Sequence, residues 1–139
     1  MTDRALNAII RYEQAARTLA DLQKQIGVAL SRCSVNIELD KALAASPQRD
    51  TSKLLVGDRV RTHLHEALTV EEPCDSGYGN RRLLGDEIGV WLEDSECAGC
   101  IEAWRLIVER KKVRQEFGIA KRVIRSIGRS AIKKEQVHE

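Results

Sequence analysis

Cysteine side chains are the residues of this chain whose type and spacing best support chemistry. Cys97 and Cys100 form a C-x-x-C pair, a spacing that serves both zinc sites and redox-active dithiols. A redox dithiol of this kind belongs to a fold of alternating strands and helices and is faced by a later proline. No proline follows Cys100, so the pair favours metal binding over redox catalysis.

Two long amphipathic helices at the ends of the chain must position these thiols. In the first, apolar residues recur at alternating spacings of four and three, which predicts a helix over about 3–32. In the second, the same spacing predicts a helix over about 96–135 that starts at Asp94 or Ser95, with Glu96 in its first turn. The first repeat consists of Ala5, Ile9, Tyr12, Ala16, Leu19, Gln23, Ile26, Leu30 and Cys33, and the second of Val113, Phe117, Ala120, Ile124, Ile127 and Ala131.

One polar residue interrupts the first repeat, and two glycines lie inside the second helix. Gln23 is the one polar member of the first repeat, which is typical of a register-fixing or an exposed position. Gly118 and Gly128 lie inside the second helix, where each weakens the helix by about 1 kcal/mol relative to alanine. A close helix contact or a kink would explain these glycines.

Short helices and loops are predicted over about 35–94. A helix is expected to follow a break at Ser34, Asp58 is expected to cap a helix that contains Leu64, and the segment 73–80 is expected to be a loop. The sequence therefore predicts one all-α domain, 1–139, with four or five helices. Its long terminal helices pair antiparallel as in a coiled coil, and apolar surface left on the pair favours a homodimer.

Antiparallel pairing of the long helices would bring Cys33 close to Cys97 and Cys100. A fourth ligand for a closed tetrahedral zinc site is then available from Cys74, or from His63 or His65 on the intervening helix. Structural zinc sites usually show two short ligand pairs, however, and this chain has one. The sequence thus predicts four inert reduced thiols and no cofactor, and the alternative is a structural zinc site at Cys33, Cys74, Cys97 and Cys100.

Charge is distributed unevenly along the 139 residues, although the net charge is only +2. Residues 51–100 contain five Lys and Arg against ten Asp and Glu, and residues 101–139 contain eleven against five. Two interpretations stay open, internal complementarity within the folded protein and a basic surface for nucleic acid or an acidic partner.

The basic residues of the last helix fall mainly outside its apolar repeat. Such a cationic face of about five turns can lie along phosphates. Its members are Lys111, Arg114, Lys121, Arg122, Arg125, Arg129 and Lys133. The face supports an alternative function, that of a nucleic-acid-binding regulator stabilised by zinc, although the region has no helix-turn-helix or zinc-finger pattern.

Catalysis is not expected from this sequence. It contains no glycine-rich phosphate loop, no nucleophile elbow and no H-E-x-x-H helix, and its adjacent acidic pairs offer no spaced acid and base. Its apolar stretches are too short for a membrane span, and the first residues lack the pattern of a signal peptide. A non-enzymatic protein of the cytoplasm that does not engage membranes is therefore expected.

The helical style of the chain, with the Ala/Arg/Ile-rich stretch from Phe117 to Arg125, resembles that of accessory proteins of bacteriophages and mobile elements. Within that group it is similar to anti-CRISPR proteins directed at a type I surveillance complex. The resemblance implies binding to a host protein or ribonucleoprotein, which blocks DNA engagement or nuclease recruitment in the host cytoplasm.

Acidic groups of the middle segment would then occupy a surface meant for DNA phosphates. They are Glu71, Glu72, Asp75, Asp86, Glu87, Glu93, Asp94 and Glu96. A structural or assembly protein of a phage particle is a further alternative.

Overall fold

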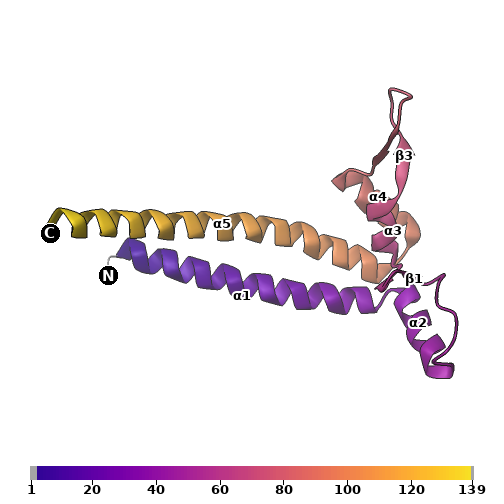
Figure 1. Cartoon of the computed structure of the whole chain (residues 1–139). Helices are drawn as coiled ribbons and strands as arrows, with labels where there is room; N and C mark the ends of the chain where they lie inside the picture. The colour runs from indigo at the N-terminus through magenta and orange to yellow at the C-terminus, as the bar shows by residue number, and fades with distance from the viewer. Residues whose placement is uncertain (1–2, 139) are drawn as a thin grey trace. The chain divides into compact units, whose positions relative to one another are not determined.

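Two long helices dominate the computed structural model, which describes residues 3–138, with side chains up to residue 136. They are α1, Asp3–Ser31, and α5, Ala98–His138 (Figure 1). The all-α class with long terminal helices packed on each other is thereby confirmed. Contacts divide the predicted domain 1–139 into two compact units: unit 1 consists of Met1–Lys24 and Ile107–Glu139, and unit 2 of Gln25–Leu106.

Unit 1 is an antiparallel pair made by most of α1 and most of α5 (Figure 1). The rings of Tyr12 and Phe117 lie 4.8 Å apart, and further along Arg110 donates a hydrogen bond of 2.8 Å to Gln23. Residue numbers therefore rise along α1 as they fall along α5, which establishes the antiparallel direction. The most buried side chains of this unit are Ala8, Ala15, Leu22 and Ala120.

Unit 2 contains the end of α1, the start of α5 and the short elements that lie between them in the chain. In chain order these are α2 Ser34–Ala45, β1 Leu55–Val56, β2 Arg59–Val60, α3 His63–Thr69, β3 Glu71–Pro73, β4 Asn80–Arg82 and α4 Gly85–Ser95. The strands form two antiparallel hairpins, in which Leu55 pairs with Val60 and Glu71 with Arg82. Helices α3 and α4 pack on each other, and their buried residues include Leu64, Ala67 and Leu92.

The predicted helix after Ser34 is confirmed as α2, but two predicted helix starts are wrong. Asp58 lies in the turn of the β1–β2 hairpin after Gly57, whose φ of 65° favours glycine, and the cap of α3 is the hydroxyl of Thr62. Asp94 and Ser95 end α4 instead of starting the last helix, because Glu96 adopts a left-handed conformation with φ 58°. The segment 73–80 is the connection within the β3–β4 hairpin.

Seven of the nine positions in the apolar repeat predicted for the first helix are at least half-buried, and two are exposed. Ile9 is 44% exposed and Gln23 is exposed, whereas their neighbours Ala8 and Leu22 are each only 4% exposed. Ranking positions by hydrophobicity favours Ile9 over Ala8, but small side chains let two helices approach closely and are therefore buried where they do. In α5 the predicted positions Val113 to Ile127 are at least half-buried, and Ala131 is exposed.

None of the helices in residues 3–138 combines the length and apolarity that crossing a bilayer requires.

The phase of α1 gives a testable prediction from two adjacent residues. Leu22→Ala removes a buried side chain from the helix pair and should lower the free energy of unfolding by about 2–4 kcal/mol. Gln23→Ala removes an exposed amide and one hydrogen bond and should cost less than about 1 kcal/mol. Urea unfolding followed by circular dichroism measures the free energy of unfolding of both variants. A larger decrease for Gln23→Ala than for Leu22→Ala would show that Gln23, and not Leu22, faces the partner helix.

Candidate metal centre

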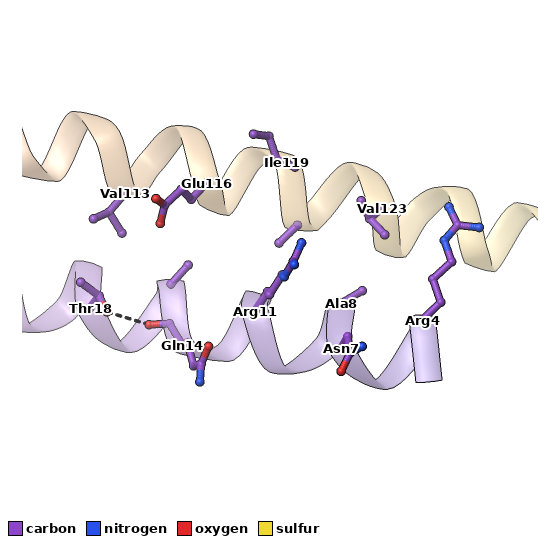
Figure 2. Close-up of a pocket in the computed structure, with 12 residues that line it drawn as sticks. Arg4, Asn7, Ala8, Arg11, Gln14, Thr18, Val113, Glu116, Ile119 and Val123 are labelled. Atoms are coloured by element: carbon purple, nitrogen blue, oxygen red, sulfur yellow. Dashed lines mark hydrogen bonds between the residues drawn. The ribbon is translucent and has the colours of Figure 1, made fainter. Parts of the chain in front are cut away.

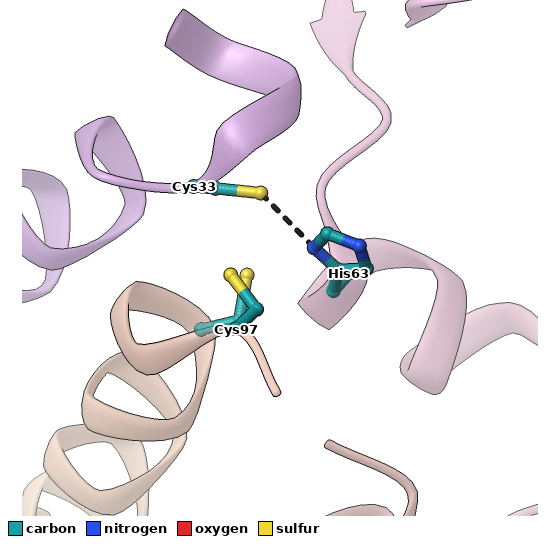
Figure 3. Close-up of side chains that lie close together, drawn as sticks. Cys33, His63 and Cys97 are labelled. Carbon is teal, nitrogen blue, oxygen red and sulfur yellow. Dashed lines mark hydrogen bonds between the residues drawn. The ribbon is translucent and has the colours of Figure 1, made fainter. Parts of the chain in front are cut away.

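Three thiols and one imidazole converge in unit 2. The ligating atoms of Cys33, His63, Cys97 and Cys100 all lie within 4.8 Å of one another (Figure 3). Within the cluster, Cys33 Sγ and His63 Nδ1 lie 3.3 Å apart. Three of the four residues are buried and His63 is half-buried, so these four side chains can hold a metal ion away from bulk water.

Helix boundaries bring His63 and Cys33 to the cluster. Thr62 caps α3 by accepting a hydrogen bond from the backbone N–H of His65, which makes His63 the first helical residue. Cys33 follows α1 and immediately precedes α2, where its extended backbone turns the chain between the two helices. Both ligands therefore lie at element junctions, where side chains project from the end of a helix.

The C-x-x-C pair lies at the start of α5. The carbonyl of Cys97 accepts the backbone N–H of Ile101, which places Cys97 just before the helix and Cys100 in its first turn. Gly99 lies between them against the end of α1. A Cβ at Gly99 would be 2.5 Å from the carbonyl oxygen of Ala29 and 3.1 Å from the backbone nitrogen of Cys33. Only a residue without a side chain permits this approach, which brings the three thiols together.

The thiols of the cluster differ in acidity. Burial opposes ionisation of Cys33, but the backbone N–H groups of His63 and Val35 and the contact with the His63 ring together lower its pKa to about 7. Burial raises the pKa of Cys100 to about 12, and the neighbouring sulfurs of Cys97 and Cys33 act in the same direction. Crowded thiols of this kind ionise together only when a cation compensates their charge.

The structure brings together three of the four predicted metal ligands. Cys74 lies in the tip of the β3–β4 hairpin, where its N–H donates to the carbonyl of Gly79, and it is not part of the cluster. The place predicted for Cys74 is taken by His63, which the sequence offered as an alternative, whereas His65 stays outside. The start of α3 decides between the histidines, because residues two apart on a helix point in different directions.

The acidic residues predicted to bind a partner lie on the β3–β4 hairpin and on α4. Glu87 is engaged within the protein: it receives two hydrogen bonds from Arg81, of 2.8 and 3.1 Å, and one from the N–H of Leu84. These bonds lower its pKa to about 2. Glu71 and Glu72 lie opposite Arg82 and Arg81 in the strand register. The five others, Asp75, Asp86, Glu93, Asp94 and Glu96, are exposed.

All seven basic residues predicted for nucleic-acid binding are exposed on α5 within unit 1. None of them is in an ion pair within the part of the chain that the structure describes. Lys121 places its ammonium group 4.3 Å from the centre of the Phe117 ring. The predicted basic face therefore exists as a row of solvated cations beside the helix contact.

A groove of about 1140 Å³ lies along the helix pair of unit 1. Figure 2 shows Arg4 and Arg11 of α1 beside Val123 and Ile119 of α5. In the same groove Thr18 donates its hydroxyl proton to the carbonyl of Gln14. Its lining combines arginine, amide and hydroxyl side chains with apolar ones and includes one carboxylate, that of Glu116. Apolar periodicity does not predict this groove, because Ala8 and Ala15, which line it, lie outside the predicted repeat.

No protein-family model, curated protein or solved structure matches this chain.

The close approach at Gly99 predicts opposite effects for two glycine substitutions in one helix. Gly99→Ala drives a methyl group into backbone atoms of α1 and should lower the free energy of unfolding by about 1–3 kcal/mol. Gly118→Ala meets nothing within 4 Å and should raise it by up to about 1 kcal/mol. Thermal unfolding of both variants checks this, and a neutral Gly99→Ala would show that the two backbones are further apart.

Proposed function

We propose that this chain is a non-enzymatic binding protein whose unit 2 is held together by a structural zinc ion. The observation that carries the proposal is the convergence of three cysteine sulfurs and one imidazole nitrogen within 4.8 Å. The four ligands would be Cys33, His63 through Nδ1, Cys97 and Cys100.

The donor set fits zinc better than other common ions. Thiolate and imidazole ligands suit Zn²⁺, whereas Mg²⁺ and Ca²⁺ require oxygen. A zinc tetrahedron with Zn–S bonds of about 2.3 Å separates its sulfurs by about 3.8 Å, so the cluster needs only a small contraction from its present spread. Four protein ligands complete the coordination and leave no position for a substrate, which is typical of structural sites.

The architecture of unit 2 supports this role. Its strands are two or three residues long and α3 has seven residues, so its local elements offer little independent stability. A zinc ion would tie the α1–α2 junction, the start of α3 and the start of α5 to one point. Binding energy of this kind is folding energy when the unfolded chain has no preformed site.

The second candidate function concerns the partner, an inhibitor of host nucleic-acid machinery such as a type I CRISPR surveillance complex. Beside the exposed acid Asp75, the tip of the β3–β4 hairpin carries Tyr78, which is 86% exposed. Exposed tyrosines beside charge are favourable anchors of protein interfaces. This tip, together with exposed acids such as Glu93 and Asp94 of α4, supports contact with a protein surface that normally holds phosphates. Homodimer formation and a role in phage assembly stay predictions.

Zinc content tests the first proposal with two matched pairs of variants. The protein purified without chelators should contain one zinc per chain by mass spectrometry, and Cys97→Ser and His63→Ala should lose most of it. Cys74→Ser and His65→Ala should retain it, because neither residue is in the cluster. Removing zinc with a chelator should lower the Tm of the parent protein and leave that of Cys97→Ser nearly unchanged. A protein that takes up no zinc or cobalt on refolding would refute the proposal.

Inhibition of a purified type I surveillance complex tests the second candidate. Added in stoichiometric amount, the protein should prevent the complex from binding its target duplex. Combined Asp75→Lys and Tyr78→Ala substitutions should abolish the effect, and reversal of Arg122, Arg125 and Arg129 to glutamate should preserve it. No inhibition at tenfold excess, or equal inhibition by the hairpin variant, would exclude this surface and partner.

A further inference from the structure

The two compact units carry net charges of opposite sign. The described residues of unit 1 include fourteen Lys and Arg against six Asp and Glu, a net charge of +8. Unit 2 has nine Lys and Arg against fourteen Asp and Glu, a net charge of −5. The near-neutral total thus conceals a strongly basic helix pair, and such a surface attracts polyanions.

Four of the basic residues of α5 repel one another along the helix. Lys121, Arg125, Arg129 and Lys133 follow at intervals of four, so each lies one turn from the next. Like charges at this spacing destabilise a helix, and all four side chains are exposed. Earlier in the helix, burial lowers the pKa of Arg110, and the neighbouring Arg114 contributes in the same direction. A row of anions beside the helix would relieve this repulsion.

The length of the basic face matches that of a nucleic-acid duplex. At ~1.5 Å per residue, the stretch from Lys111 to Lys133 covers about 33 Å, close to the ~34 Å of one DNA turn. A duplex presents one phosphate charge for every ~1.7 Å of its axis. Several phosphates therefore lie within reach of the face at once.

The surroundings of the face distinguish a duplex from other anionic partners. The aromatic residues of unit 1 are Tyr12 and Phe117, and they are occupied by each other and by Lys121. No aromatic ring of unit 1 is left on which an unpaired base would stack, so single-stranded nucleic acid would gain little binding free energy from stacking. Two copies of unit 1 would each bring a net charge of +8 to the contact, and their electrostatic repulsion opposes dimer formation through this face.

Gly118 is a second, independent observation at the centre of the face. Of the four positions that lie three or four residues away in the helix, three are taken by Arg114, Lys121 and Arg122, and the fourth is Gln115. The predicted close helix contact does not account for the glycine, since a Cβ there would meet nothing within 4 Å. Glycine also allows a ligand to approach the backbone closely. Among three cations, the ligand admitted there would be a phosphate.

We infer that the basic face of α5 in unit 1 binds the phosphate backbone of double-stranded nucleic acid, independently of base sequence. The inference does not depend on the zinc ion of unit 2 or on the inhibitor candidate. DNA and RNA duplexes share the phosphate backbone but differ in groove width, and the experiment below distinguishes between them.

Fluorescence anisotropy with 24-base-pair DNA and RNA duplexes of mixed sequence tests the inference. At least one duplex should bind the full-length protein, with log Kd changing against log salt by about 4–6, as expected for five or six neutralised phosphates. Charge reversal at Arg122, Arg125 and Arg129 should weaken binding at least tenfold and reduce that slope by about 3. A matched reversal in unit 2, at Lys41, Arg49 and Arg59, should change Kd less than threefold.

Fold and specificity controls accompany these measurements. Each variant must retain the parent's helical circular dichroism and zinc content, which excludes unfolding as the cause of lost binding. A 24-nucleotide single strand should bind more weakly than the duplex. Equal or tighter binding to the single strand, an unchanged Kd after charge reversal on α5, or no duplex binding at 50 mM salt would each overturn the inference. Binding confined to an acidic polypeptide such as polyglutamate would assign the face to a protein partner instead.

The variant Gly118→Leu tests the binding surface without destabilising the fold. Leucine is a better helix former than glycine, and a Cβ at this position meets nothing within 4 Å, so the variant should be at least as stable as the parent. Its side chain covers the gap between Arg114, Lys121 and Arg122, and duplex affinity should fall at least threefold. An unchanged Kd in this stable variant would remove Gly118 from the binding surface.

Discussion

The approach of two backbones at Gly99 is the constraint on which unit 2 depends. The end of α1 and the start of α5 come so close there that no side chain fits between them. This contact brings the thiols of Cys97 and Cys100 to Cys33, which no local sequence pattern connects. Because the capping of α3 by Thr62 delivers His63 to the same point, one helix start and one close contact are sufficient to assemble four ligands.

A metal ion held by the four clustered side chains would compensate for the low local stability of unit 2. Its two-residue strands and seven-residue helix cannot support one another through hydrogen bonds alone. The side chains buried around them, such as Leu64, Ala67 and Leu92, form a small apolar core. Bidentate pairing of Arg81 with Glu87 links the β3–β4 hairpin to the first turn of α4. A central ion joined to three elements would complement these contacts because it fixes positions that small cores leave loose.

Sequence reasoning recovered the long helices because their periodicity extends over many turns. It failed where a choice between adjacent residues depends on the partner helix: Ala8 is buried, whereas the larger and more hydrophobic Ile9 beside it is exposed. The same limit applies to the metal cluster. The C-x-x-C pair is visible as a short motif, but the selection of His63 over His65 depends on where α3 begins. The predicted start of this helix at Asp58 is wrong, because the β1–β2 hairpin that precedes it has strands of only two residues, which are too short to show a periodic pattern.

Helix α5 connects the chemistry of the two units through a single element. Its first turn bears Cys100, and its later turns bear the basic face, so the same helix contributes to a metal cluster and to a cationic surface. The two demands do not conflict, because the apolar positions Val113 to Ile127 occupy a separate stripe that packs on α1. A helix of 41 residues can retain like charges at four-residue intervals because this stripe, and not its own surface, provides most of its stability. Repulsion among exposed cations is thus tolerated in the folded protein.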